Sequence, residues 1–316
     1  MRLGILGAGR IAQRAIGPAA RKARNVDLVA AASRDQGRAG SLGAQRAYGS
    51  YAALLDDADV EAVFVTTHNG LHAELAIEAL RRGKHVLCEK PLAPSAAECE
   101  RMVAEAERSG GVLMEAFMYR YHPQVAALEG VVRAGRLGEV TRVDASFHFE
   151  LTRPEDVRLV RAFGGGALLD VGCYCVNASR LFLGDDIHGV TACGVMNGPE
   201  GVDMEGRATL AFASGATADV SFGFTGPMRQ QLTLHGTRGE ASLNWAFAYR
   251  GEPHVLDVRS GSTSERTTFG ETDTYQLEIE DFANAVATGG QPRLARDEGL
   301  KSARVIDRIA HALRAT

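Results

Sequence analysis

Residues 2–16, RLGILGAGRIAQRAI, decide the fold of this chain. The apolar run at residues 2–6 has the length and composition of a buried strand, and a helical pattern over residues 10–23 follows it directly. Gly17-Pro18 would favour a break within that helix. The stretch therefore predicts a strand, a short glycine-containing turn and a helix at the start of an α/β unit.

The turn itself, GAGRIA, matches the pattern G-x-G-x-x-A. Gly7 permits a tight turn, Gly9 lets the backbone approach a pyrophosphate, and Ala12 is the small residue where helix and strand pack closely. Arg10 and Ile11 complete the loop. An ordinary strand-to-helix turn is the alternative, but the position at the start of a βαβ pattern predicts a dinucleotide site to which these five residues contribute.

The rest of the first third alternates apolar runs with helical patterns. Strands are predicted at residues 26–33, 61–67, 85–90 and 112–117, and helices at 73–83 and 95–110. Continuous apolar strands that alternate with helices are typical of a parallel sheet covered on both faces. We therefore predict an α/β chain whose residues 1–118 form a Rossmann dinucleotide-binding domain.

The pattern changes near residue 119. In residues 140–151, Val143, Ala145, Phe147 and Phe149 alternate with polar residues, which indicates a strand buried on one face. Similar runs recur at residues 206–215, 216–224, 229–236, 240–245 and 254–260, and 259–268 reads as a polar strand or loop. Helices are predicted at 275–290 and 297–315. Residues 119–316 are thus predicted to form an α+β domain with a largely antiparallel open sheet, whose C-terminal helix is free to pack back on the first domain.

Composition narrows the class of protein. The 316 residues carry a formal net charge of −4, which gives no electrostatic case for nucleic acid, and no apolar run reaches transmembrane length. The number of cysteines, 5, is odd and no C-x-x-C occurs, so neither a disulfide framework nor a zinc site is indicated. We expect a cytoplasmic protein with reduced thiols and no membrane partner.

The end of the second predicted strand favours NADP over NAD. NAD sites usually carry an acid there that binds the ribose 2′-hydroxyl, but this chain has Ser33 and Arg34. A hydroxyl and a guanidinium suit a 2′-phosphate, and Arg38 follows one helical turn later. Asp35 is an acid close to this position, so NAD remains possible as the cofactor. The alternative for Arg34 and Arg38 is that they form a solvated surface.

A second glycine-rich stretch, GGGALLDVGCYCVNASRLFLG at residues 164–184, opens another helix. A helix that begins near Leu168 would place Asp170 and Tyr174 on one face, with Asn177 about one turn further. The structural alternatives are a helix cap for Asp170 and a core aromatic for Tyr174.

Three segments together with GAGRIA resemble the Gfo/Idh/MocA oxidoreductases. They are TTHNGLHAELAIEALRRGKHVLCEKPLA at residues 66–93, EAFMYRYHPQ at 115–124 and GGGALLDVGCYCVN at 164–177. The resemblance covers essentially the whole chain and implies action on sugars, cyclitols and related alcohols. It also implies that Lys90 lies by the nicotinamide and the substrate hydroxyl, and that Asp170 and Tyr174 point into the same pocket.

Tyrosine at position 174 resembles the branch of glucose–fructose oxidoreductase, NADP-dependent xylose dehydrogenases and dihydrodiol dehydrogenases. His68 departs from the family, which usually has proline there. Its spacing to His72 would allow zinc on a helix, but Gly70 and the loop context argue against a metal. The resemblance adds further nucleotide contacts at Thr67, Asn69, His72 and Glu89.

The domain crossover supplies three candidate substrate or nicotinamide contacts, Tyr119, Arg120 and His122. Arg153, which precedes the glycine run at residues 164–166, is a further candidate substrate contact. A structural role is the alternative for His122, and surface exposure is the alternative for Arg153 and the neighbouring Arg158. Tyr174 is assigned as general acid/base, Lys90 as electrostatic partner and proton relay, and Asp170 as orienter, with Lys90 as the base in a second assignment.

These residues predict an NADP-dependent oxidoreductase that acts on a sugar, polyol or related alcohol. A nicotinamide-dependent glycosidase of the same fold and a non-catalytic nucleotide-sensing regulator are the alternatives, although retention of Lys90, Asp170 and Tyr174 argues against the regulator. The family resemblance also implies a homodimer or homotetramer.

Overall fold

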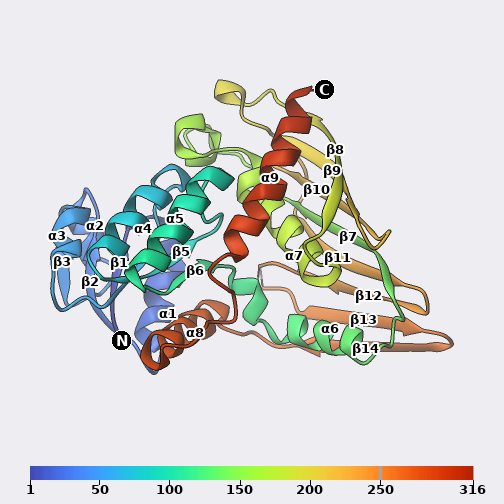
Figure 1. Cartoon of the computed structure of the whole chain (residues 1–316), viewed down its shortest axis with the longest axis horizontal. Coiled ribbons are helices and arrows are strands. Elements are labelled where there is room, and N and C mark those ends of the chain that lie inside the picture. The colour runs from blue at the N-terminus through green and yellow to red at the C-terminus, as the bar shows by residue number, and fades with distance from the viewer. Residues whose placement is uncertain (249–250, 316) are drawn as a thin grey trace. The chain divides into compact units, whose positions relative to one another are not determined.

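The structure is a computed structural model that describes residues 1–248 and 251–315. The chain forms two compact units (Figure 1). Unit 1 comprises Met1–Met118 and Asp273–Ala303, and unit 2 comprises Tyr119–Thr272 and Arg304–Thr316. No helix within the two described stretches is both long and apolar enough to cross a membrane.

Unit 1 is built on a parallel sheet with strand order β3-β2-β1-β4-β5-β6. The strands are β1 (Arg2–Leu6), β2 (Asp27–Ala32), β3 (Arg46–Tyr48), β4 (Ala62–Val65), β5 (His85–Glu89) and β6 (Leu113–Ala116). The strand order reverses between β1 and β4, and ligands of open α/β sheets bind beside the carboxyl ends of strands at such a point. The predicted Rossmann-type parallel sheet is confirmed.

Helices cover this sheet on both faces. They are η1 (Ala12–Ile16, a π-helix), α1 (Gly17–Lys22), α2 (Gln36–Gly40), α3 (Tyr51–Leu55), η2 (Asn69–Leu71), α4 (His72–Arg81), α5 (Ala96–Ser109), α8 (Thr274–Thr288) and the first part of α9 (Glu298–Ala315). Gly17-Pro18 does not interrupt the helical backbone, since Ile16 and Gly17 both keep helical φ and ψ, but the π-helix η1 changes to the α-helix α1 there, with the proline in the first turn of α1.

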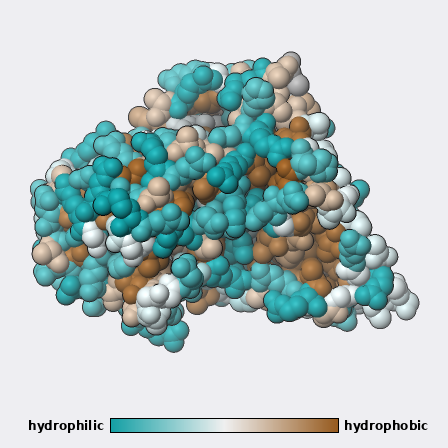
Figure 2. Space-filling model, in the orientation of Figure 1, coloured by the Kyte–Doolittle hydropathy of each residue, from teal (hydrophilic) through white to brown (hydrophobic). Residues whose placement is uncertain are grey.

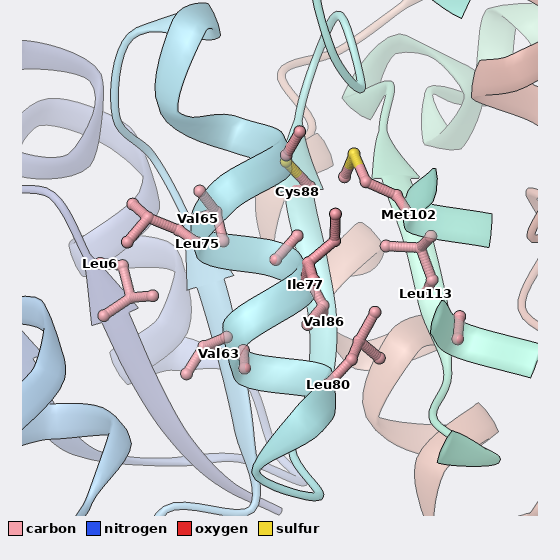
Figure 3. Packing of buried hydrophobic residues seen from close by; sticks show 14 of the residues in the cluster. Leu6, Val63, Val65, Leu75, Ile77, Leu80, Val86, Cys88, Met102 and Leu113 are labelled. Atoms are coloured by element: carbon pink, nitrogen blue, oxygen red, sulfur yellow. The ribbon is translucent and has the colours of Figure 1, made fainter. Parts of the chain in front are cut away.

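The core of unit 1 lies between the sheet and α4 and α5. Figure 3 shows Leu75, Ile77 and Leu80 of α4 among side chains of β1, β4, β5, β6 and α5, namely Leu6, Val63, Val65, Val86, Cys88, Leu113 and Met102. Burying each large aliphatic side chain stabilises the fold by about 1.5–3 kcal/mol. The visible surface over α4 and α5 is mostly hydrophilic (Figure 2), as an amphipathic helix requires.

Unit 2 is built on a sheet with strand order β14-β13-β12-β11-β7-β10-β9-β8. The strands are β7 (Val140–His148), β8 (Ile187–Val195), β9 (Glu205–Phe212), β10 (Thr217–Gly223), β11 (Arg229–Gly236), β12 (Gly239–Asn244), β13 (His254–Ser260) and β14 (Thr263–Phe269). Among the described strands, β7 and β10 are parallel and the other neighbours are antiparallel. The predicted, largely antiparallel sheet is confirmed.

One face of this sheet is covered by the segment that carries Asp170 and Tyr174. That segment consists of η6 (Leu168–Gly172, a π-helix) and α7 (Cys173–Leu183), which contact β7 and β10. The remaining helices of unit 2 are α6 (Pro123–Arg133), which contacts β13, and the short η3 (Met118–Tyr121), η4 (Val157–Leu159), η5 (Arg161–Phe163) and η7 (Pro199–Gly201). Alternate residues of β9 are buried, as period-two patterning predicts.

A fully buried carboxyl group lies in α8. Glu278 has no exposed surface, and neither of its carboxylate oxygens has a hydrogen-bond partner in the part of the chain that the structure describes. Burial raises the pKa of Glu278 well above its usual value, and the nearby carboxyl groups of Glu89, Asp281 and Glu115 raise it further. Burial therefore favours the protonated, neutral form of Glu278 in the folded protein.

We expect Glu278→Gln to stabilise the protein, and to do so more at pH 8 than at pH 5. The pKa of Glu278 is higher in the folded state than in the unfolded state, so folding binds a proton and stability falls as pH rises above about 4.3. Glutamine has nearly the same shape and needs no proton. Thermal unfolding at both pH values measures the difference, and each kcal/mol regained raises Tm by roughly 2–4 °C.

Glu280→Gln is the matched control on the same helix. Burial opposes the shift, but hydrogen bonds from Gln276 and Arg24 lower the pKa of Glu280. This variant should therefore destabilise the protein at neutral pH, and the difference should shrink as pH falls. A Glu278→Gln variant that behaves in the same way would show that Glu278 is ionised and paired.

Candidate active site

The glycine loop follows β1 at the point where the strand order reverses. Gly7 has φ +111°, and a Cβ there would lie 3.0 Å from the backbone and the hydroxyl of Thr66, so only glycine fits. The Gly7 N–H donates to Ala32 O at 2.9 Å, and Thr66 Oγ1 donates to Gly7 O at 2.9 Å. These bonds tie the loop to the ends of β2 and β4.

The remaining residues of the glycine loop are open or exposed, except for Ala12, which is buried. A Cβ on Gly9 would meet only Thr66 O, at 3.9 Å, so the backbone there is open to a ligand. Arg10 is exposed, the Ile11 side chain is 40% exposed, and Ala12 is fully buried at the start of η1. The arrangement fits the predicted division between residues that contact a nucleotide and one that packs the helix on the sheet.

The end of β2 carries a basic group. Asp35 caps α2 by accepting the Arg38 N–H at 3.2 Å, and Ser33 Oγ accepts the Asp35 N–H at 3.3 Å. Arg38 Nη2 donates to Ala8 O at 3.0 Å, so its guanidinium reaches the glycine loop. Arg34 is exposed. Burial raises the pKa of Tyr51, and the charges of Arg34 and Arg38 act against that shift, which places the phenol near both.

The loops after β4 and β5 meet at the ring of His72. This ring is fully buried, with Nδ1 2.9 Å from Pro91 O and Nε2 3.2 Å from Thr67 O. Burial lowers the pKa of His72 to about 4, although both carbonyl oxygens favour protonation, and the charges of His68 and Lys90 lower it further. His72 is therefore neutral at pH 7.

Lys90 lies just past the carboxyl end of β5 and is partly exposed, while Glu89 is buried. The Lys90–Pro91 peptide bond is cis. Glu115, at the end of β6, accepts the Leu92 N–H at 2.7 Å. In the described residues no group of three or more His, Cys, Asp or Glu side chains could hold a metal ion.

In unit 2, Asp170 forms an ion pair with Arg158. Arg158 Nε lies 2.6 Å from Asp170 Oδ2, and Arg158 Nη1 lies 3.1 Å from Asp156 Oδ1. The carboxylate of Asp170 raises the pKa of Arg158 above its usual value, despite burial. Arg153 contacts Asp156 instead, at 3.2 Å, and about half of its side chain is exposed.

Asp203 takes the capping role that was the structural alternative for Asp170. Its Oδ2 accepts the Leu168 N–H at 2.6 Å. A Cβ on Gly166, which has φ +115°, would lie 2.2 Å from Asp203 Oδ1, and one on Gly165 would lie 2.5 Å from Arg158 O. The glycine run thus lets Asp203 and the Arg158 backbone approach the start of the helix. Sequence reasoning missed Asp203, because an isolated acid in a loop carries no pattern.

Tyr174 belongs to an aromatic cluster on the covered face of the sheet. Its ring lies 5.8 Å from Tyr119, 5.4 Å from Phe147 and 5.6 Å from Phe247, measured between ring centroids. Its exposed fraction is 5%. The packing holds the ring in one orientation, as a core aromatic would be held.

The other predicted substrate contacts, Tyr119, Arg120 and His122, lie at the start of unit 2. Tyr119 donates a hydrogen bond to Asn177 Oδ1 at 2.5 Å, and Arg120 Nη1 lies 3.4 Å from the same oxygen. His122 Nδ1 accepts the Gln124 N–H at 3.2 Å and so caps α6. Burial, together with His254, whose ring centroid lies 4.1 Å away, lowers the pKa of His122 to about 4. The structural alternative thus accounts for the position of His122.

Individual proteins resemble the chain over nearly its full length. The D-xylose 1-dehydrogenase (NADP(+)) 2 of Haloferax volcanii is 40% identical over 98% of this chain and 96% of that protein. A crystal structure of KijD10, a 3-ketoreductase from Actinomadura kijaniata in complex with NADP and TDP-benzene, is 32% identical with a TM-score of 0.91 and covers 99% of this chain and 98% of that one. The aldose-aldose oxidoreductase of Caulobacter crescentus, solved with glycerol, is 30% identical with a TM-score of 0.92 over 100% of this chain and 98% of that one.

Both parts of the chain also match protein families. Residues 1–117 match the oxidoreductase family with an NAD-binding Rossmann fold, and residues 125–242 match the GFO/IDH/MocA C-terminal domain. The predicted family and the predicted oxidoreductase class are confirmed. The chain therefore belongs to the Gfo/Idh/MocA family of oxidoreductases.

Proposed function

We propose that this protein is an NADP-dependent dehydrogenase or reductase that transfers a hydride between nicotinamide and a hydroxyl-bearing carbon of a sugar or polyol. Its relatives named above act on D-xylose with NADP, reduce a 3-keto group or oxidise and reduce aldoses, as their names state. The observation that carries the proposal is the position of Lys90, at the carboxyl end of β5 in a sheet whose order reverses at β1 and β4.

The residues of unit 1 fit NADP. Gly7 and Gly9 give the backbone room for the pyrophosphate, and Arg34 and Arg38 supply cationic donors for the 2′-phosphate. Asp35, the acid that kept NAD open, uses its carboxylate to cap α2. Bound NADP would supply the hydride acceptor or, in the reverse direction, the donor.

Residues of this chain would take the proton that leaves the substrate hydroxyl. A phenol titrates near ~10, so Tyr174 needs a nearby cation to serve as a base at neutral pH. We propose that the Lys90 ammonium is that cation, and that Tyr174 takes the hydroxyl proton during oxidation. Lys90 as the base itself is the second assignment. Asp170 is already paired with Arg158, so we propose that it orients neighbouring groups through that ion pair and transfers no proton.

Arg34→Ala should weaken NADP binding much more than NAD binding. Loss of a charge-assisted bond to a phosphate typically costs ~1.5–3 kcal/mol, or about ten- to a hundredfold in affinity. Calorimetric titration with each nucleotide measures both losses. Arg101→Ala, which removes another exposed arginine of unit 1, should change neither affinity. Equal losses for both nucleotides on Arg34→Ala would contradict the assignment.

Lys90→Met should abolish turnover without unfolding the protein. Methionine keeps much of the side-chain volume and removes the charge. We expect turnover to fall by at least ~10²-fold, because general acid–base catalysis contributes about that much, while Tm stays within a few degrees. Lys22→Met, on an exposed ammonium paired with Asp273, is the control. If turnover stays within a factor of a few, Lys90 is structural.

Tyr174→Phe should lower turnover by ~10²–10⁴-fold with little change in NADP affinity. The ring would stay packed against Phe147 and Phe247, so the change removes one oxygen and no packing. The pH profile of oxidation should change as well, because its alkaline rise belongs to the coupled Tyr174–Lys90 pair. Tyr174→His should restore part of the rate with a lower apparent pKa. Full turnover with an unchanged profile would make Tyr174 a core aromatic only.

Incubation of the protein with NADP and a panel of aldoses, polyols and glycosides tests the function itself. Growth of the reduced-nicotinamide absorbance with one sugar supports the dehydrogenase. Release of an aglycone without net NADPH would identify the glycosidase alternative, and nucleotide binding without any turnover would identify the regulator. We further propose a cytoplasmic homodimer or homotetramer. The free cysteines support a reduced compartment, and light scattering of the purified protein tests the assembly.

A further inference from the structure

The turn that carries Lys90 is held by buried side chains at both polar atoms of one peptide group, the one that joins Pro91 to Leu92. His72 Nδ1 lies 2.9 Å from the Pro91 carbonyl oxygen, and Glu115 Oε1 accepts the Leu92 N–H at 2.7 Å. His72 has no exposed surface and Glu115 is 3% exposed. The two groups come from different elements, the start of α4 and the end of β6, so the turn is fixed from two sides.

The other ring nitrogen of His72 lies beside the neighbouring loop. Its Nε2 lies 3.2 Å from Thr67 O, just past β4, and β4 is the parallel neighbour of β5. A neutral imidazole has one N–H, and the shorter contact assigns it to Nδ1, which then donates to Pro91 O. Since His72 is neutral at pH 7, it holds the turn without placing a second positive charge beside Lys90.

We propose that His72 and Glu115 are positioning residues that fix the ammonium of Lys90 for proton transfer. This inference rests on the proposed function, in which Lys90 acts on the substrate hydroxyl. A lysine side chain has several rotatable bonds, so a turn that moves would add to the spread of its charge, and holding the adjacent Pro91–Leu92 peptide removes that contribution. A displacement of about 1 Å at a reacting group can cost ~10²-fold in rate, whereas substrate and nucleotide affinities depend on other contacts.

A matched pair of variants tests His72. In His72→Asn, the side-chain amide nitrogen stands where Nδ1 stood and can still donate to Pro91 O. In His72→Gln, the longer side chain carries its amide to the position of Nε2, beside Thr67 O. We expect His72→Asn to keep kcat within a few-fold, and His72→Gln to lose ~10–100-fold in kcat with KM for the sugar and the affinity for NADP nearly unchanged. Equal kcat in the two variants, at equal Tm, would overturn the proposal for His72.

Glu115 gives an independent test of the other contact. Glu115→Gln retains a side-chain oxygen that can accept the Leu92 N–H, and Glu115→Met does not. The conservative variant should keep the alkaline limb of the kcat profile in place. The methionine variant should move it and lower kcat, because the Lys90 charge then lies at a different distance from its partner. An unchanged profile in Glu115→Met would overturn the role of Glu115.

A third measurement separates this proposal from the proposed function. Modification of Lys90 by an amine reagent at a series of pH values, followed by mass spectrometry, measures the pH at which Lys90 becomes reactive and requires no turnover. His72→Gln and Glu115→Met should shift the pH at which Lys90 reacts, and His72→Asn and Glu115→Gln should not. If Lys90→Met remains fully active, the catalytic role proposed for Lys90 fails, while this shift still establishes that the two residues fix Lys90. If the shift is absent in all variants, the positioning role is wrong.

Discussion

The contact between Gly7 and Thr66 is the constraint on which the nucleotide half of this protein depends. A Cβ at Gly7 would lie 3.0 Å from Thr66 backbone atoms, so the loop can turn back over the end of β4 only because that atom is absent. This turn lets the carbonyl of Ala8 meet the guanidinium of Arg38. It also leaves space at Gly9, where a Cβ would meet only Thr66 O, at 3.9 Å. One close approach therefore determines the course of the glycine loop and which of its carbonyl groups the Arg38 guanidinium reaches.

Buried titratable groups follow one of two courses in both units. Where no opposite charge is near, burial favours the neutral form, as it does for His72 and Glu278 in unit 1 and for His122 in unit 2. Where an arginine side chain is near, the carboxylate is kept charged in an ion pair, as for Glu280 in unit 1 and Asp170 in unit 2. Neutral groups suit a rigid frame beneath a loop, whereas an ion pair fixes the orientation of its donors and acceptors.

Much of the fold follows from sequence patterns, and the exceptions have physical reasons. The buried strands β1, β4 and β5 are continuous apolar runs, and β7 and β9 alternate visibly. In contrast, β8 was not predicted, because as an edge strand it is mostly exposed and lacks alternation, and β3 is only 3 residues long. Local motifs likewise indicated Lys90, Asp170 and Tyr174. They could not show that Asp203 caps the helix at Leu168, because that contact joins residues far apart in the chain.

The division of unit 1 into two chain segments has a consequence for how the protein is made. Its second segment, Asp273–Ala303, includes α8, which packs against α1, and Gly299 of α9. A Cβ on Gly299 would lie 2.6 Å from Leu92 Cβ, so the start of α9 rests directly on the turn that carries Lys90. During translation, the ribosome releases this covering only after Tyr119–Thr272, the larger segment of unit 2, has been synthesised. The nascent Rossmann sheet therefore lacks this covering while Tyr119–Thr272 is being synthesised, and the turn that carries Lys90 is completed only afterwards.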